Sequence, residues 1–304
     1  VLSQDHSKNK VSFATNHGIA PIVQLLAMGN ERAQMHAAHA LASLGLDDEK
    51  NQGQIASLLV GVLGSGSLES KSRAANALWR LVQENPTSQQ TIATAGTASE
   101  LIALLKEGAD DAQAYALWSL SLSIDENSQK TLLEEDGVQP LVAALKATKS
   151  KTATAPAEVT RQQAAAAISL LAHNNGKSQQ VIAQAGGIEP LIQILLPDRA
   201  DSIESREHAA AALSDLALLQ PNRVTIVEGG GIDPIVLLLK EGASNGKRNA
   251  AAALARLATG SDEIATAIAH AGAIAPLVDL LSGAHGDGAQ EEGADALFAL
   301  AGNE

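Results

Sequence analysis

Three patterns in the sequence contain residue types that perform chemistry in other proteins, and each predicts a different ligand or reaction. Gly176-Lys177-Ser178 matches the end of a phosphate-binding loop, whose backbone amides hold a nucleotide. His36 and His39 stand three residues apart, which places two imidazoles on one side of a helix where they could ligate a metal ion. Serine, histidine and acidic residues, the members of a nucleophilic triad, also occur along the chain.

The surrounding sequence completes none of these sites. A phosphate loop has a glycine five residues before its second glycine, and that position holds Leu171. No third ligand accompanies the two histidines at metal-site spacing, and no serine lies in a nucleophile elbow. We therefore expect a protein that is not an enzyme, has no small-molecule substrate and needs no metal or other cofactor.

A different kind of chemistry, the binding of another protein, is indicated by the aromatic residues. Trp79 and Trp118 are the only tryptophans; Arg80 adjoins the first, and Tyr115 lies about one helical turn from the second. Aromatic side chains and arginine dominate binding hot spots, and aromatic rings bury a large area. The alternative is that both tryptophans pack between neighbouring helices, since large aromatic side chains are usually buried. The sequence leaves both interpretations open.

The composition favours helices and disfavours a nucleic-acid partner. The 304 residues are 45% hydrophobic but only 2% aromatic, so the apolar content is mostly aliphatic. Sheets prefer aromatic and β-branched residues, whereas alanine and leucine are good helix formers. The net charge is −13, which opposes binding to phosphate backbones and to anionic membranes. Acidity increases along the chain, from −4 over residues 1–152 to −9 over residues 153–304.

Cysteine usage and apolar runs bear on the compartment. The chain contains no cysteine, and its first residues lack the apolar core of a signal peptide. Its longest apolar run, around residues 55–63, is far shorter than the ~20 residues that span a bilayer. We expect an intracellular protein, cytoplasmic, nuclear or both, with no membrane contact through this segment. Because the chain begins at Val1 without methionine, we interpret it as a fragment of a longer protein.

A repeated pattern supplies the elements that would position these residues. Five segments share a small-residue turn, an aliphatic residue, a proline two places later and an aliphatic run: HGIAPIVQLL (17–26), DGVQPLVAAL (136–145), GGIEPLIQIL (186–195), GGIDPIVLLL (230–239) and GAIAPLVDLL (272–281). Glycine can adopt the left-handed conformation that ends a helix, and proline fits the first turn of the next one. Each segment therefore predicts a glycine turn that leads from one helix into a second.

An alanine-rich stretch follows each of these segments and predicts a third helix. The last leucines of these stretches, and of two similar ones, are spaced by 37, 39, 51, 45, 41 and 43 residues: Leu44, Leu81, Leu120, Leu171, Leu216, Leu257 and Leu300. This period brackets the ~40–47 residues of helical solenoid repeats. One such unit cannot bury its own apolar face, so stacked neighbours must bury it together. We expect Leu213, Leu254 and Leu297 to lie in the shared core.

The pattern N…I…AGGIxPLIxLL…AAxALxxLA resembles the armadillo repeat family over roughly residues 9–304. The resemblance implies an all-α fold, a right-handed α-solenoid of about seven three-helix repeats whose third helices line a groove. We expect one domain over residues 1–304, with units at about 9–46, 47–84, 85–124, 125–173, 174–219, 220–259 and 260–304. The second unit lacks the proline turn, and the third has Glu100 in place of proline. Residues 146–161 lengthen the fourth unit, and we expect an exposed loop there.

Helical geometry predicts which residues face the groove. We define position n as the residue before each last leucine and turn 100° per residue. Positions n, n−1, n−4 and n−8 then lie opposite the leucine and alanine face. The predicted partner-binding residues on this arc are His39, Asn76, Trp79, Arg80, Tyr115, Trp118, Asp215, Arg248 and Arg256.

These observations support three hypotheses about function. The first is a non-catalytic scaffold that binds an extended peptide or helix of a protein partner in the groove. The second is the substrate-binding array of a U-box-type ubiquitin ligase. The third, a nuclear import adaptor, is disfavoured because importin-α-like proteins carry asparagine at n and tryptophan at n−4. Here n−4 holds no tryptophan and n holds no asparagine, the residues at n being Ser43, Arg80, Ser119, Leu170, Asp215, Arg256 and Ala299.

Overall fold

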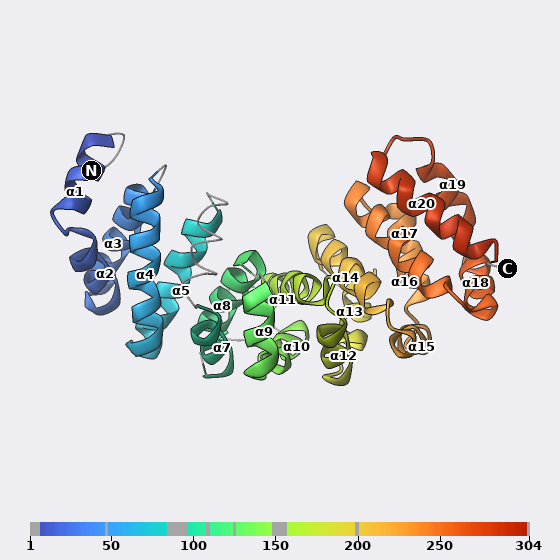
Figure 1. The fold of residues 1–304 in the computed structure, drawn as a ribbon, viewed down its shortest axis with the longest axis horizontal. Helices are drawn as coiled ribbons and strands as arrows, with labels where there is room; N and C mark the ends of the chain where they lie inside the picture. Colours follow the sequence, from blue (N-terminus) through green and yellow to red (C-terminus); the bar gives the residue numbers. More distant parts are fainter. Residues whose placement is uncertain are drawn as a thin grey trace. The chain divides into compact units, whose positions relative to one another are not determined.

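The computed structural model describes residues 7–45, 48–83, 97–107, 110–123, 126–147, 157–197 and 201–302. Within these residues the chain forms nineteen α-helices and no strand (Figure 1). The all-α fold class expected from the sequence is confirmed.

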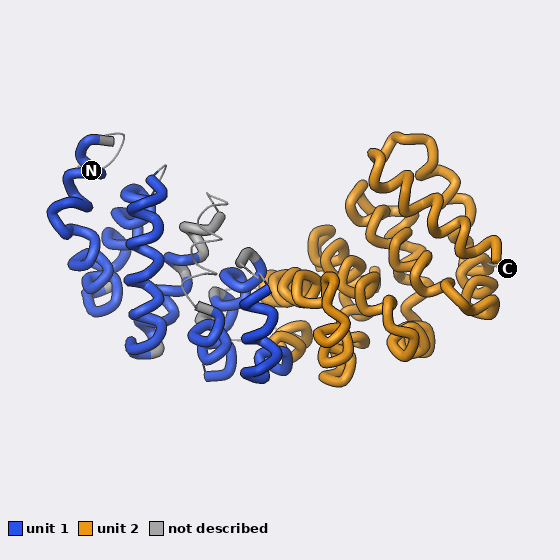
Figure 2. The backbone as a smooth tube through the Cα atoms, viewed as in Figure 1, with its two compact units in different colours: residues 1–140, 149–155 blue, residues 141–148, 156–304 orange. Residues whose placement is uncertain are grey.

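Contacts between helices divide the chain into two compact units, residues 1–140 with 149–155 and residues 141–148 with 156–304 (Figure 2). The helices of unit 1 are α1 (Ser7–Thr15), α2 (Ile19–Met28), α3 (Glu31–Gly45), α4 (Glu49–Ser65), α5 (Leu68–Gln83), α7 (Thr97–Glu107), α8 (Asp110–Ser123) and α9 (Glu126–Glu134). The single domain over residues 1–304 and the boundaries of its seven repeats stay predictions.

Unit 2 contains most of α10 (Val138–Leu145) and all the helices that follow it. These are α11 (Ala157–Ala172), α12 (Gly176–Gln184), α13 (Ile188–Leu195), α14 (Ile203–Leu216), α15 (Gln220–Glu228), α16 (Ile232–Glu241), α17 (Ser244–Ala258), α18 (Asp262–His270), α19 (Ile274–Leu280) and α20 (Asp287–Leu300). In the described part of the chain, no single helix is long and apolar enough to cross a membrane. Only α18 and α19 taken together reach that length, and they are bent by 86°.

The helices of unit 2 repeat in threes, as the sequence predicts. A nine-residue first helix (α12, α15, α18) leads through a tight turn into a second helix (α13, α16, α19), and a longer third helix follows (α14, α17, α20). Proline is the third residue of every second helix in this set, where its missing N–H has no helical partner to lose. Asn175 and Ser261 cap two of the first helices, and their side chains accept hydrogen bonds from backbone amides in the first turn.

Two adjacent glycines make the turn between the first and second helices at α12–α13 and at α15–α16. Gly186 and Gly230 have φ of 76° and 74°, a left-handed conformation that disfavours any side chain. The next glycine has an ordinary φ but no room, because a Cβ on Gly187 would lie 2.8 Å from Cγ2 of Ile182. The glycine pair thus reverses the chain while the second helix stays in close contact with the first.

Third helices pack on one another and form the core of unit 2. α14 contacts α11 on one side and α17 on the other, and α17 in turn contacts α20. Leu213 and Leu254 are fully buried between them, which confirms two of the three expected core leucines. The expectation for Leu297 on α20 is wrong: its side chain is partly exposed, because no further helix in the described part of the chain covers the outer side of α20.

Buried amide side chains join a third helix to the following repeat at three joints of the described chain. Asn51 Nδ2 donates to the carbonyl oxygen of Leu44 at 3.1 Å, linking the start of α4 to the end of α3. Gln179 Nε2 donates to Ala172 O at 2.9 Å, and Asn222 Nδ2 donates to Leu216 O at 3.0 Å. The last carbonyls of a helix have no partner within it, so these amides satisfy them and fix the angle of the following helix.

The second predicted repeat, residues 47–84, departs from the three-helix pattern where its sequence lacks the glycine-proline turn. α4 is one continuous helix of 17 residues, in the place where the repeats of unit 2 have two helices. In the third predicted repeat, Glu100 lies in the first turn of α7, in the place of the usual proline. A helix tolerates other residues there, so the loss of proline does not abolish the second helix.

A buried ion pair between Arg161 and Asp201 stabilises the fourth predicted repeat. The loop expected over residues 146–161 is wrong from residue 157 on, because α11 begins at Ala157 and Arg161 within this helix is buried. Its Nε donates to Oδ1 of Asp201 at 2.7 Å, and its Nη1 donates to the carbonyl oxygen of Ala147 at 2.8 Å. The side chain of Asp201 is 0% exposed. Arg161 therefore ties α11 to the segments that follow α10 and precede α14; residues 148–156 of the expected loop lie outside the described residues.

Candidate functional site

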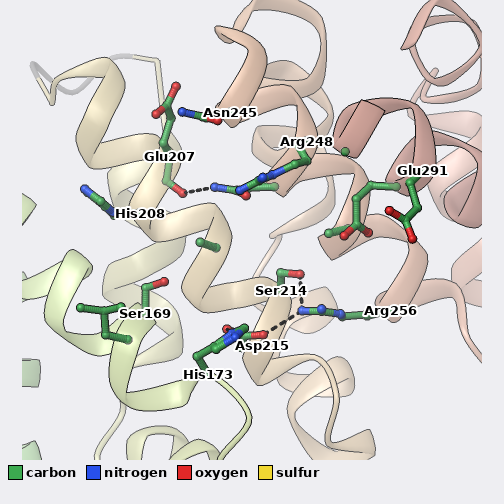
Figure 3. A pocket seen from close by; sticks show the side chains of 16 residues that line it. Ser169, His173, Glu207, His208, Ser214, Asp215, Asn245, Arg248, Arg256 and Glu291 are labelled. Carbon is green, nitrogen blue, oxygen red and sulfur yellow. Dashed lines mark hydrogen bonds and ion pairs between the residues drawn. The ribbon is translucent and has the colours of Figure 1, made fainter. Parts of the chain in front are cut away.

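A groove with a volume of about 570 Å³ runs across the third helices of unit 2. Figure 3 shows side chains from α11, α14, α17 and α20 converging on it. Its floor includes Ala211 and Ala252, two small residues at position n−4, together with Leu170, which is 41% exposed. Because alanines occupy these positions, the groove has space for the side chains of a ligand.

One polar network occupies an end of this groove. Arg256 reaches from α17 to α14, where its Nη1 donates to Asp215 Oδ1 at 2.9 Å and to Ser214 Oγ at 2.6 Å (Figure 3). The other carboxylate oxygen of Asp215 lies 3.2 Å from Nδ1 of His173 on the loop after α11. Asp215 is buried, so these partners offset the cost of removing its charge from water.

The other end of the groove is more open. Arg248, two helical turns before Arg256 on α17, is exposed, and its aliphatic stem passes close over Gly288 at the start of α20. A Cβ at Gly288 would lie 3.3 Å from Cδ of Arg248, so the glycine leaves room for this side chain. Asn249 Nδ2 donates to the carbonyl oxygen of Glu207 on α14 at 3.0 Å. Arg248 and Glu207 thus line the groove from neighbouring helices.

Two titratable groups in the groove have shifted pKa values. Burial raises the pKa of Glu292, Arg256 and Arg248 lower it, and Asp295 and Glu291 raise it further. The net shift is upward, so burial and the neighbouring carboxylates outweigh the arginines.

His208 shifts in the opposite sense. Burial lowers its pKa, with Glu204 opposing the shift, and the neutral imidazole is therefore favoured.

The raised pKa of Glu292 predicts a pH-dependent stability. Its stabilising contribution is fully present below the ordinary carboxyl pKa and is lost as the pH rises through the raised value. At neutral pH the charged form is thus unfavourable, and Glu292→Gln should raise the urea midpoint of unfolding. The gain should shrink toward pH 4, where Glu292 itself is protonated. The exposed neighbour Glu291→Gln is the control, and an equal, pH-independent gain in both variants would contradict the prediction.

The charges of the groove alternate from helix to helix. Glu207 and Asp215 come from α14, Arg248 and Arg256 from α17, and Glu291 and Glu292 from α20. The described residues contain no group of three or more histidine and acidic side chains placed to hold a metal ion. His39, one of the two histidines singled out in the sequence, is exposed and has its Nδ1 2.9 Å from the Met35 carbonyl of its own helix. The alternating charges that line the groove suit reversible recognition of charged side chains.

The structure brings together one part of the predicted binding set. Asp215, Arg248 and Arg256 line the same groove. His39 lies on α3 in unit 1, and Trp118 on α8 is half-buried. The side chains of the other four predicted residues lie outside the described part of the structure: Asn76, Trp79, Arg80 and Tyr115. Their role in binding stays a prediction.

The groove residues that the sequence reasoning missed include three titratable ones, His173, His208 and Glu292. His173 lies two residues after the anchor Leu171, in a connection that was not considered as part of the groove. Glu292 is the neighbour of Glu291, which occupies position n−8 of the last repeat. His208 follows the n−8 residue Glu207 in the same way. A wider arc that admits n−7 would have found both Glu292 and His208.

Comparisons with known proteins point to one class of repeat protein. No protein-family model matches the chain. U-box domain-containing protein 12 of Arabidopsis thaliana is 39% identical over 95 residues, which are 31% of this chain and 14% of that protein. Protein CELLULOSE SYNTHASE INTERACTIVE 3 of the same plant is 26% identical over 269 residues, 86% of this chain and 12% of that protein. The matched segments thus span only 14% and 12% of the length of these curated relatives.

Solved structures match over most or all of the chain. An engineered protein has a TM-score of 0.78 and 26% identity, with coverage of 100% of this chain and 73% of that one. A designed armadillo repeat protein has a TM-score of 0.67 and 27% identity over 80% of this chain and 99% of that one. Computationally designed armadillo repeat proteins for modular peptide recognition have a TM-score of 0.65 and 26% identity, covering 80% of this chain and 98% of theirs.

Proposed function

We propose that this chain, a member of the armadillo repeat family, is a non-catalytic scaffold that takes an extended peptide or a helix of a protein partner into the groove of unit 2. The observation that carries the proposal is the groove itself, about 570 Å³ of space lined by four successive third helices. Designed relatives of the same fold are described as proteins for peptide recognition, which supports this use of the surface.

The lining favours a partner segment that carries lysine or arginine. Asp215 and Arg256 neutralise each other, which leaves Arg248 facing Glu207, Glu291 and Glu292. The accessible charge is therefore negative, and the alanine floor offers apolar contact to the stem of a long cationic side chain.

The test is the binding of a fluorescein-labelled octapeptide of alternating lysine and arginine, followed by fluorescence anisotropy. Glu207→Gln with Glu291→Gln should weaken binding by about tenfold or more, because both carboxylates line the groove. The matched control is Glu189→Gln with Glu228→Gln, which removes the same charge from exposed positions on α13 and α15.

The control decides between specific binding and general attraction to an acidic protein. Equal loss of affinity in the two double variants would mean that the peptide senses only net charge. No binding of the octapeptide to the unaltered chain would contradict the proposed cationic ligand.

The alternative is that the chain is the substrate-binding array of a U-box-type ubiquitin ligase. The observation in its favour is the 39% identity to a U-box domain-containing protein over 95 residues. Both proposals use the groove as the binding site, and they differ in whether the same polypeptide contains a U-box. Determination of the full reading frame tests the alternative, which requires a U-box in the same polypeptide and transfer of ubiquitin to the captured partner.

A further inference from the structure

One row of charged side chains lines the groove from the same position of three successive third helices. Glu207 on α14, Arg248 on α17 and Glu291 on α20 each occupy position n−8. The same position in α11 holds the uncharged Gln162. From α14 onward the row is therefore acidic, basic and acidic.

Contacts between the helices place the members of this row side by side. Asn249, next to Arg248, donates from Nδ2 to the carbonyl oxygen of Glu207 at 3.0 Å, so these turns of α17 and α14 adjoin. A Cβ on Gly288 would lie 3.3 Å from Cδ of Arg248, and Glu291 follows Gly288 by about one turn. Figure 3 shows Arg248 between Glu207 and Glu291. A ligand that follows the groove from α14 to α20 thus meets one cation between two carboxylates.

A second row, at position n, differs because its charges are already paired. Arg256 Nη1 donates to Asp215 Oδ1 at 2.9 Å, and Asp215 is buried. Among the residues that the structure describes, no ion pair engages Glu207, Arg248 or Glu291. Charges without an ion-pair partner in the protein are the ones that an oppositely charged ligand can complement.

The neighbouring titratable groups do not change the order of charges in the row. His208 adjoins Glu207, and burial lowers its pKa, so the neutral imidazole is favoured. Glu292 is partly buried, and burial raises its pKa, whereas Glu291 is exposed. Glu291 is therefore the more accessible carboxylate on the α20 side of Arg248.

We propose that the groove selects a partner segment in which one acidic residue is flanked on both sides by lysine or arginine, and that Arg248 determines this selectivity. The inference rests on the proposed function, the capture of an extended segment in the groove of unit 2. The acidic side chain of the ligand accepts charge-assisted hydrogen bonds from Arg248, while the flanking cations meet Glu207 and Glu291. A uniformly basic segment would instead place a cation against Arg248, which is unfavourable.

Helix packing sets the approximate spacing of this ligand. Packed helices lie about 8–10 Å apart, and an extended chain advances about 3.3 Å per residue. One step from α14 to α17, or from α17 to α20, therefore corresponds to about three residues of the ligand. The acidic residue should lie at about that distance from the basic residues on either side.

Two fluorescein-labelled nonapeptides of identical composition test the order of charges. Each contains six lysines, two serines and one glutamate and is amidated at its C-terminus, which removes the terminal carboxylate. The glutamate is the central residue in one peptide, KKKSESKKK, and the last residue in the other, KKKSKSKKE. Fluorescence anisotropy should show that the unaltered chain binds the first peptide about tenfold more tightly than the second. In the Arg248→Gln variant the two affinities should become equal.

The lysine-arginine octapeptide should respond to Arg248→Gln in the opposite sense. Its binding should strengthen by about twofold or more, because the substitution removes repulsion between Arg248 and a ligand cation. Binding of the nonapeptide with central glutamate should weaken. The matched control is Lys177→Gln, which removes the same charge from an exposed position on α12. It should shift the affinities for all three cationic peptides in one direction and leave the ratio of the two nonapeptides unchanged. Circular dichroism should show unchanged helical content in both variants, since both side chains are exposed.

The outcomes separate this inference from the proposed function. Equal binding of the two nonapeptides to the unaltered chain would overturn the inference, as would an Arg248→Gln variant that shifts the octapeptide and the nonapeptide with central glutamate in the same direction. If Glu207→Gln with Glu291→Gln still weakened binding in that case, the groove would remain the binding site. Absence of binding by every peptide, or binding that the same double variant leaves unchanged, would contradict both the proposed function and the inference.

Discussion

Leu254→Ala should lower the free energy of unfolding of unit 2 by about 2–5 kcal/mol, as expected for a fully buried leucine replaced by alanine. Leu254 lies on α17, which packs between α14 and α20, so the cavity would open on both neighbours. The measurement is urea unfolding followed by circular dichroism. Leu297→Ala makes the same chemical change at the equivalent but partly exposed position on α20, and its cost should be clearly smaller. Equal costs would contradict the assignment of the core.

The damage from Leu254→Ala should also be local. Each repeat of a solenoid contacts only its neighbours, so stability is the sum of repeat and nearest-neighbour contributions. Hydrogen exchange should therefore accelerate first in α17 and in the helices packed against it, α14 and α20. Uniform acceleration over unit 2 would indicate one cooperative block instead.

Asp201→Asn should lower the free energy of unfolding by about 3–5 kcal/mol, because it leaves the buried guanidinium of Arg161 without its counter-charge. The double variant Arg161→Met with Asp201→Asn removes both charges and should recover part of the loss. Both variants are compared with the unaltered chain by urea unfolding at neutral pH. A double variant as unstable as Asp201→Asn alone would show that hydrogen bonds rather than the unpaired charge set the cost.

The regular elements were predictable because local chemistry and tertiary packing agree. The glycine pair at 186–187 and Pro190 define the turn in α12–α13 from the sequence alone, and the structure places them there. The alanine-rich third helices were equally clear, since their leucines recur at a repeat period. The errors fell where packing depends on a neighbour: Leu297 has the pattern of a core residue, but no described helix covers it.

The sequence indicated which helix faces line the groove, but not the contacts that the side chains make there. Helical geometry correctly placed Asp215, Arg248 and Arg256 together, because they lie on equivalent faces of successive helices. It could not show that Asp215 and Arg256 would pair with each other, since that contact joins residues 41 positions apart. It also missed His173, whose contribution depends on the path of a connection rather than on a helical face.

The hydrogen bonds that side-chain amides form between repeats determine where the chain can accept inserted residues. The connection from a third helix to the next first helix is three residues long at 173–175, 217–219 and 259–261. Asn222 and Gln179 each bridge one of these joints, so an insertion there would pull a donor away from its carbonyl. The connections from second to third helix vary instead, from two residues at 242–243 to six at 281–286. Evolutionary insertions and grafted loops should therefore be tolerated between second and third helices and selected against at the joints.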